Sequence, residues 1–355
     1  MGSKIILREF SKSPLPIDQR KILDSQGYDS QRDTISVINA NYVKGPPRHN
    51  CIVCLSTELT HAYTNLGVVY NSYAICGHVN GDRCLSPQFV SACYEDDNAD
   101  YSSLYRSQDY QARLDLIYEP KLSFLERVLI ADGFSLRNDF KILELGAGVG
   151  YFATVASRKG YLVDALELSP ALIKIAQQIR SLEVVDAVVP EKVSSELGVR
   201  DAITSFSGDC VVMLGVLEHL IDPNDVLAAF RESDAKYLYL LVPMFGLANL
   251  VEITSSSSYP RHGSGAHTHF FTNQSLEVAA EIAGCDVIAE WRLGSDIRDL
   301  FIGILQSKKI GDSFKESMAK SLFSMEESLQ SFIDQNEFSS EMHVVFKKNN
   351  GSKSE

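Results

Sequence analysis

Residues 142–150, which read ILELGAGVG, decide the fold of this chain. The apolar run ends at Leu145, and glycines then alternate with small apolar residues up to Gly150. Glycines at a turn from strand to helix let the backbone approach a ligand closely, and the helix behind them offers unpaired N–H groups. The segment predicts a strand, a turn that binds a nucleotide-like ligand and a following helix. The alternative is a tight turn without a ligand.

Two acids frame this glycine loop. Glu167 ends the next apolar run, where an ionised carboxylate can accept both hydroxyls of a ribose. The dinucleotide fingerprint requires a glycine where this chain has Tyr151, and Glu144 would repel a pyrophosphate, so a nicotinamide or flavin site is the weaker interpretation. Glu144 instead suits a ligand with a cationic amino group and no phosphate, such as S-adenosylmethionine.

Strand and helix patterns alternate from about residue 119 onward. Apolar runs predict strands at residues 141–145, 161–168, 210–214, 237–242, 285–293 and 342–347. Helical spacing predicts helices at residues 122–131, 151–158, 225–231, 274–283 and 313–336. This alternation is typical of an α/β fold with a doubly wound, mostly parallel sheet covered on both faces. The third strand stays open, because residues 182–189 and 202–206 both qualify.

Length and charge narrow the class of protein. The 355 residues carry 46 acidic and 33 basic side chains, a net charge of -13, and the length allows two domains. An acidic balance with basic runs no longer than pairs argues against nucleic acid as a partner. The apolar stretches are too short to span a bilayer and the N-terminus has no signal-like run, so we expect a soluble, cytoplasmic protein without a membrane span.

The cysteine content and the hydrophobic periodicity of the chain change near residue 115. Residues 1–115 hold five of the seven cysteines and show weak periodicity, which predicts a smaller irregular accessory domain. Residues 116–349 are predicted to form the α/β domain, with a helical insertion at about residues 313–336 and a disordered tail at residues 350–355. An apolar stripe in the insertion indicates either intrachain core or a homodimer contact. Its members are Phe314, Met318, Leu322, Met325, Leu329 and Phe332.

Three motifs together resemble a known family. The sequence ELGAGVG at residues 144–150, the acid Glu167, and VLEHLIDP at residues 216–223 follow the order and spacing of class I S-adenosylmethionine-dependent methyltransferases, over about residues 120–349. The resemblance implies a Rossmann-like, seven-stranded sheet and S-adenosylmethionine as cofactor. The cofactor-binding residues that it implies are Glu144, Gly146, Ala147, Gly148, Gly150, Glu167, Leu168, Gly215, Val216 and Tyr105. Asp186 and Asp201 are candidates for binding the adenine.

Histidines after the fourth and fifth strands are candidates for catalysis. Methyl transfer to an alcohol or an enolisable carbon requires removal of a proton, and histidine titrates near working pH. His267 and His269 are therefore the predicted general bases. The alternatives are a metal site, because the pair shares one face of an extended segment, or residues that only shape the pocket. Glu218 and His219 either take part in catalysis or cap their loop.

Residues 267–276, HTHFFTNQSL, are similar to the same region of methyltransferases that modify sugars in nucleotide-sugar, antibiotic and surface-polysaccharide pathways. In the C-methyltransferases of that group an acid-histidine pair is linked to proton removal, and this chain has Thr268 in place of the acid. The resemblance favours transfer to a hydroxyl of a sugar-containing small molecule, with C- or N-methylation as the alternative. A nicotinamide oxidoreductase and a non-catalytic cofactor-binding module are more distant alternatives.

The cysteines of the N-terminal part suggest a metal. Cys51 and Cys54 have the two-residue gap that lets two thiolates reach one zinc ion. Cys76 and His78 look like the end of a second pair, in which Tyr73 takes the place of the partner. The sugar methyltransferases named above often begin with a zinc-binding module of this type. Two interpretations stay open: zinc bound by Cys51, Cys54, Cys76 and His78, with His61 or Cys84 as other candidates for the missing ligand, or a degenerate module with free or buried thiols.

Overall fold

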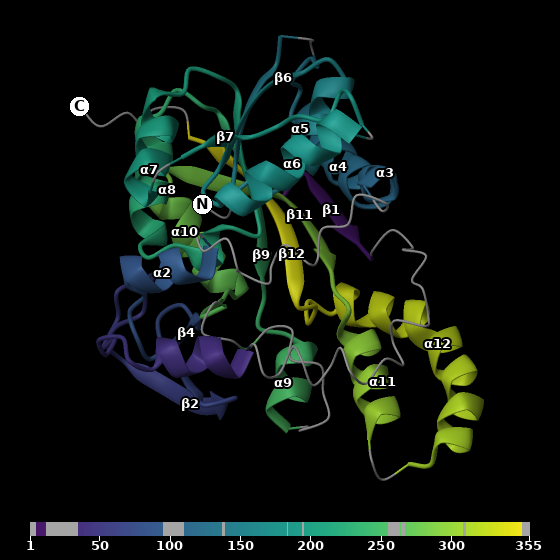
Figure 1. The fold of residues 1–355 in the computed structure, drawn as a ribbon. Helices are drawn as coiled ribbons and strands as arrows, with labels where there is room; N and C mark the ends of the chain where they lie inside the picture. Colours follow the sequence, from purple (N-terminus) through teal and green to yellow (C-terminus); the bar gives the residue numbers. More distant parts are fainter. Residues whose placement is uncertain are drawn as a thin grey trace.

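The computed structural model describes residues 5–11, 35–94, 110–136, 139–182, 184–193, 195–254, 263, 267–307 and 310–349 (Figure 1). Within them lie one sheet of eight strands and a second sheet of four. The predicted cofactor residue Tyr105 and the predicted tail at residues 350–355 lie outside the described residues. Within the described part, every helix is too short or too polar to cross a membrane.

The large sheet has the strand order β1-β11-β12-β9-β8-β5-β6-β7. Its strands are β1 (Leu7–Phe10), β5 (Lys141–Leu145), β6 (Leu162–Glu167), β7 (Glu191–Lys192), β8 (Cys210–Leu214), β9 (Tyr237–Pro243), β11 (Cys285–Leu293) and β12 (Glu341–Lys348). The pairs from β9 to β7 are parallel, whereas β12 runs antiparallel to both of its neighbours. The predicted doubly wound, mostly parallel sheet is confirmed. Seven strands is one too few, because β1 from the N-terminal part adds to the edge beside β11.

Helices cover both faces of this sheet (Figure 1). One face carries α4 (Glu119–Ala131), α5 (Tyr151–Arg158) and α6 (Pro170–Leu182), and the other carries α7 (Glu196–Ser205), α8 (Pro223–Glu232) and α10 (Asn273–Ile282). Successive side chains of a strand point to opposite faces. Ile142 therefore packs with residues of α4 and α5, whereas its neighbour Leu143 packs with residues of α7 and α8.

Both ranges that the sequence offered for the third strand are wrong. Strand β7 comprises only two residues, Glu191 and Lys192, and lies outside both proposed ranges. Residues 202–206 instead lie at the end of helix α7, whose first turn is capped by the side chain of Ser195. The apolar residues Val199 and Ile203 are buried at a spacing of one helical turn, so their pattern belongs to a helix and not to a strand.

The second sheet joins distant parts of the chain. Its order is β10-β4-β3-β2, with strands β2 (Leu59–Asn65), β3 (Val68–Tyr73), β4 (Val79–Gly81) and β10 (His269–Phe270). Three strands come from the N-terminal part, and β10 comes from the loop that follows β9. The loop that carries His267 and His269 is therefore fixed against the N-terminal segment by backbone pairing.

The remaining helices lie around these two sheets. They are α2 (Pro87–Tyr94), α3 (Tyr110–Arg113), the π-helix η4 (Leu114–Tyr118), the 3-10 helix η5 (Leu217–His219), α9 (Leu247–Thr254), α11 (Asp296–Gln306) and α12 (Asp312–Gln335). Helices α11 and α12 form a hairpin that extends away from the small sheet (Figure 1). On α12, Phe314, Met325, Leu329 and Phe332 are exposed. The stripe is therefore not intrachain core, and the homodimer contact stays a prediction.

Candidate active site

A cavity lies at the carboxyl ends of β5, β6 and β8, where ligands bind in open α/β folds. Most of the predicted cofactor residues line it. They are Glu144, Gly146, Ala147, Gly148, Glu167, Leu168, Gly215 and Val216. The cavity also meets residues that the sequence analysis did not single out, chiefly Tyr118, Cys93 and Leu172. The structure therefore gathers three separate motifs around one space.

Gly150 has a different place from the other loop glycines. It precedes α5 with a φ of 80°, a left-handed backbone conformation that residues other than glycine rarely adopt. A Cβ at this position would overlap the backbone carbonyl oxygen of Val188. Gly150 therefore shapes the loop from behind and does not line the cavity.

Glu167 is held in place by the backbone of the loop. Its Oε2 accepts a hydrogen bond from Gly148 N at 2.7 Å, and its Oε1 accepts one from Ser169 N at 2.8 Å. Burial raises the pKa of this carboxyl. Because each carboxylate oxygen has a second lone pair, both can still accept a hydrogen bond from a hydroxyl. This pair of free acceptor sites fits the two hydroxyls of a ribose.

Glu144 provides a buried carboxyl group at the other side of the loop. Its side chain is 3% exposed, and no residue in the described part of the chain forms a hydrogen bond with its Oε2. Burial raises its pKa to about 8. A buried carboxylate without a partner is costly unless a cation neutralises it. The ionised carboxylate would accept hydrogen bonds from the ammonium group of S-adenosylmethionine.

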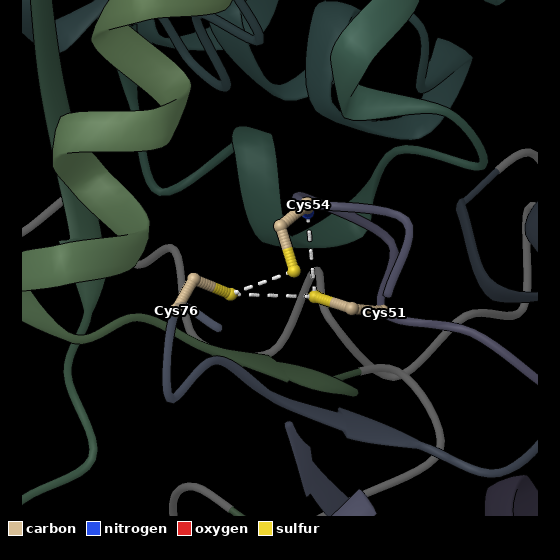
Figure 2. A group of neighbouring side chains, drawn as sticks. All are labelled: Cys51, Cys54 and Cys76. Atoms are coloured by element: carbon tan, nitrogen blue, oxygen red, sulfur yellow. Dashed lines mark hydrogen bonds between the residues drawn. The ribbon is translucent and has the colours of Figure 1, made fainter. Parts of the chain in front are cut away.

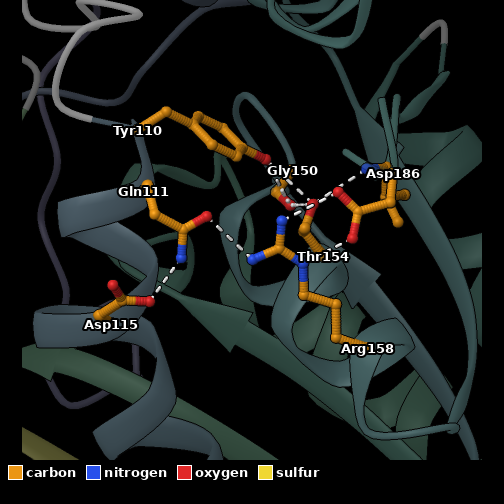
Figure 3. A network of polar contacts seen from close by, with 8 residues as sticks. Tyr110, Gln111, Asp115, Gly150, Thr154, Arg158 and Asp186 are labelled. Carbon is orange, nitrogen blue, oxygen red and sulfur yellow. Dashed lines mark hydrogen bonds and ion pairs between the residues drawn. The ribbon is translucent and has the colours of Figure 1, made fainter. Parts of the chain in front are cut away.

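A polar network supports the glycine loop from α3 and α5 (Figure 3). The hydroxyls of Tyr110 and Thr154 lie 3.0 Å apart, and Thr154 donates to the carbonyl of Gly150 at 2.6 Å. Arg158 binds both carboxylate oxygens of Asp186, at 2.7 and 2.9 Å. Asp186 is thus occupied by an ion pair outside the cavity lining, so its candidacy for the adenine finds no support.

Two aromatic residues, Tyr118 and Tyr151, line the cavity. Tyr151 lines the cavity, and its ring stacks on that of Tyr118 at 4.9 Å between centroids. Tyr151 is the residue that departs from the dinucleotide fingerprint, and that departure was its one signal in the sequence. The other adenine candidate, Asp201, lies on α7 and is exposed. Apolar Val199 of the same helix lines the cavity instead.

Three of the four predicted catalytic residues come together beside the cavity. The ring centroids of His219 and His267 lie 4.5 Å apart, and His219 lines the cavity. Glu218 is buried, and its Oε1 lies 3.9 Å from His219 Nε2. Burial raises the pKa of Glu218 to about 8. One ligand atom from each residue lies within 4.8 Å of the other two, so the group can exchange a proton or hold a divalent cation.

His269 does not join this group. It lies in β10, is 2% exposed, and stacks on His78 with 5.8 Å between ring centroids. Its Nε2 lies 3.3 Å from the hydroxyl of Thr268. Burial lowers its pKa well below the usual value, so the ring stays neutral inside the small sheet. His269 is therefore placed as a packing residue beside the cavity and not in its lining.

The cysteines form a second site, the thiol cluster, which comprises Cys51, Cys54 and Cys76 (Figure 2). The Sγ atoms of Cys51 and Cys76 lie 3.6 Å apart, and those of Cys54 and Cys76 lie 3.2 Å apart. Three thiolates at about 2.3 Å from one zinc ion would lie about 3.8 Å from each other. Hydrogen bonding from Cys51 lowers the pKa of Cys76 to about 6, which favours a thiolate at Cys76, whereas the same contact raises the pKa of Cys51.

His78 is not part of the thiol cluster. Its Nδ1 lies 3.3 Å from Ser275 Oγ, and its ring packs edge-on against Phe271. Its predicted role as the fourth ligand therefore finds no support in the geometry. Tyr73, at the place of the missing cysteine, is buried. Among the described cysteines, the sulfur atoms of Cys51, Cys54 and Cys76 are the ones that lie close enough together to hold one metal ion.

The comparison with known families defines the class. The model of a methyltransferase domain family matches residues 110–290, just over half of the chain. This chain belongs to that methyltransferase domain family, and its class is that of the class I S-adenosylmethionine-dependent methyltransferases.

Curated relatives match a shorter part of the chain. The mitochondrial ubiquinone biosynthesis O-methyltransferase of Schizosaccharomyces pombe is 30% identical over 147 residues, which cover 40% of this chain and 51% of the relative. The ubiquinone biosynthesis O-methyltransferase of Paracidovorax citrulli is 31% identical over 102 residues, which cover 28% of this chain and 40% of the relative. The chain thus spans about half the length of the curated relatives it matches, or less.

Solved structures are similar only at low identity. Phosphoethanolamine N-methyltransferase 2 of Haemonchus contortus, in complex with S-adenosyl-L-methionine, is 13% identical, with a TM-score of 0.45, and the match covers 77% of this chain and 62% of that one. A magnesium protoporphyrin IX methyltransferase from Synechocystis is 12% identical, with a TM-score of 0.40, and the match covers 74% and 92%. The class therefore rests on the family match.

Proposed function

We propose that this protein transfers the methyl group of S-adenosylmethionine to a hydroxyl oxygen of a small, sugar-containing molecule, with a histidine as general base. One observation carries the proposal: the ring centroids of His219, which lines the cavity, and His267, which lies behind it, are 4.5 Å apart beside the buried Glu218. The relatives named as O-methyltransferases support oxygen as the acceptor atom. The preference for a sugar rests on the resemblance of residues 267–276.

The chemistry needs one proton acceptor and good alignment. S-adenosylmethionine supplies a methyl carbon bound to a positively charged sulfur. When bound, it would offer this carbon to the acceptor oxygen: the oxygen–carbon bond would form as the carbon–sulfur bond broke, and the electron pair of the broken bond would stay on sulfur and neutralise its charge. His267 takes the hydroxyl proton and becomes an imidazolium, which lies against the ring of His219 beside Glu218. Much of the acceleration comes from holding two bound reactants in line.

A zinc ion at the thiol cluster completes the proposal. Three sulfur ligands within 3.6 Å of their neighbours support it, because such a donor set binds Zn²⁺ in preference to a hard cation. The ion would stabilise the N-terminal part of the chain and would not take part in methyl transfer. Cys51 and Cys76 are fully buried, which agrees with a structural role.

Replacement of His267 by alanine tests the base. With S-adenosylmethionine and a panel of nucleotide sugars and glycosides, turnover measured by mass spectrometry should fall by roughly 10²- to 10⁴-fold. The affinity for S-adenosylhomocysteine should stay within about threefold, because His267 does not line the cavity. His61→Ala, at an exposed histidine of β2, is the matched control. A parallel fall in cofactor affinity, or a product methylated on carbon, would contradict the proposal.

A further inference from the structure

We propose that the thiol cluster, with bound zinc, positions the two loops that carry His219 and His267, through side-chain hydrogen bonds from Asn224 and Thr272. This inference rests on the proposed function, because it assigns a role to the loops that bear the proton acceptors. It adds two positioning residues, Asn224 and Thr272, and it makes the arrangement of the acceptor side dependent on metal. Binding of the cofactor at the glycine loop should not share this dependence.

The first link joins the Cys51–Cys54 turn to the loop after β8. Asn224 lies in the first turn of α8, five positions after His219. Its Nδ2 donates to the carbonyl of Ile52 at 3.0 Å and to the carbonyl of Val53 at 2.9 Å. Both carbonyls belong to the two residues between the paired cysteines. The position of the His219 loop therefore depends on the shape of this turn, which a bound metal would fix.

The second link joins Cys76 to the loop after β9. Thr272 lies five positions after His267, and its Oγ1 donates to the carbonyl of Cys76 at 2.6 Å. The same Oγ1 accepts a hydrogen bond from Ser275 N, because Thr272 caps helix α10. One hydroxyl thus fixes both the start of α10 and the third cysteine of the thiol cluster.

The two links share one rigid support. Asn80 of β4 accepts a hydrogen bond from Ile52 N at 3.0 Å and pairs with His269 across the small sheet. Cys51 and Cys76 pack in the same buried core as Leu220 and Phe271, one from each loop. A shift of the thiols therefore moves both loops, and through them the two rings that lie 4.5 Å apart. Proton transfer is sensitive to displacements of this kind.

The hydrogen bonds that hold the cofactor side lie elsewhere. Glu167 is bonded to Gly148 and Ser169, and Gly150 is held by Thr154. These contacts lie within β6, α5 and the glycine loop, and none of them involves the thiol cluster. Loosening of the cluster should therefore leave residues 144–151 unchanged, and the affinity for S-adenosylhomocysteine should fall only slightly, because Val216, His219 and Leu220 form one part of the cavity wall and the glycine loop and Glu167 form another.

Hydrogen–deuterium exchange of the full-length protein tests the inference without knowledge of the acceptor. The zinc-loaded protein should contain about one zinc per chain. Removal of zinc by a chelator should increase amide exchange about tenfold in residues 216–224 and 267–276, and leave residues 144–151 unchanged. Affinity for S-adenosylhomocysteine should stay within about twofold. Absence of zinc from the zinc-loaded protein, or exchange that does not respond to its removal, would overturn the proposal.

Two variants assign the effect to the named side chains. Asn224→Ala should loosen residues 216–224 in the zinc-loaded protein, and removal of zinc should then have little further effect there, because both changes act through one link. Thr272→Val should loosen residues 267–276, and Thr272→Ser, which keeps the hydroxyl, should restore them. Asn249→Ala is the control, because this buried asparagine accepts its hydrogen bond from Gly246 N, away from the thiol cluster.

The outcomes separate this inference from the proposed function. If zinc removal and Asn224→Ala increase amide exchange in residues 216–224 additively, the first link is wrong. If Thr272→Ser shows the same exchange as Thr272→Val, the second link is wrong. Both conclusions hold even where methyl transfer is intact. If His267→Ala keeps full turnover, the proposed base is wrong, and the exchange results stand unchanged. A cofactor affinity that falls about tenfold on zinc removal would show that the cluster acts on the whole fold and would also overturn the inference.

Discussion

The cofactor half and the acceptor half of the site are built from the chain in opposite ways. In the cofactor half, β5, the glycine loop and α5 are consecutive, and Glu167 ends the next strand. The acceptor half consists of the thiol cluster, residues 216–224 and residues 267–272, which are far apart in the sequence. Local sequence therefore determines the first half, whereas long-range hydrogen bonds and packing determine the second.

Replacement of Gly150 by alanine should destabilise the cofactor half more than any other change proposed below. The new Cβ would meet the carbonyl of Val188 in a left-handed conformation, so we expect a loss of about 3 kcal/mol in the free energy of unfolding. Urea unfolding and calorimetry with S-adenosylhomocysteine measure stability and affinity.

Gly133→Ala is the matched control for this loss. Gly133 has a similar φ of 77°, but no atom lies within 4 Å of a Cβ built there. We expect a cost of about 1–2 kcal/mol and unchanged affinity for the cofactor product. If Gly150→Ala were no worse than Gly133→Ala in both measurements, close packing behind the loop would not be what fixes it.

Glu167→Ala should have the next largest effect. It removes the acceptor of hydrogen bonds from Gly148 N and Ser169 N together with the proposed acceptor for the ribose. We expect affinity for S-adenosylhomocysteine to fall by about 1–3 kcal/mol, as measured by titration calorimetry. Glu191→Ala, at an exposed acid of the neighbouring strand β7, is the control and should keep normal affinity. Exchange in the acceptor half should not change, and a change there would show that the two halves are coupled.

The glycine loop could be predicted from the sequence to the residue, and the acceptor half could not. The bounds of β5 and α5 agree with the apolar run and the helical spacing, because each pattern lies within one continuous segment. The short strands β2, β3, β4 and β10 carry no clear alternation, and β10 has only two residues. His267 and His269 share a spacing that suggested one role, yet only His269 lies in β10 and is buried. Pairing with β4, which the sequence does not reveal, separates them.

The pH dependence of cofactor binding should report on Glu144. Its pKa is raised from 4.5 to about 8, so the carboxyl is mostly protonated at pH 7 in the ligand-free protein and must ionise to bind an ammonium group. Affinity for S-adenosylmethionine should therefore rise between pH 6 and pH 7.5, by at most about tenfold per pH unit. Glu144→Gln should give weaker binding with a flat profile over that range.

The same shift has an opposite effect on stability. Because the folded state holds the proton more tightly than the unfolded state, the contribution of Glu144 to stability is greatest below pH 4.5 and is lost as the pH rises through about 8. Melting temperatures of the ligand-free protein and of Glu144→Gln should therefore diverge with rising pH. An equal pH dependence of the two proteins in both measurements would show that Glu144 is ionised throughout.

Asp186→Asn should have the smallest effect and marks the boundary of the cofactor half. Asp186 is 53% exposed, and Arg158, which binds both of its oxygens, lowers its pKa. An exposed ion pair contributes about 0–1 kcal/mol, so stability should change by less than about 1 kcal/mol. Affinity for S-adenosylhomocysteine should change by less than about twofold, in the calorimetric conditions used for Glu167→Ala. A loss of about tenfold would mean that Asp186 leaves Arg158 to bind the adenine, and that the cofactor half extends beyond the cavity seen here.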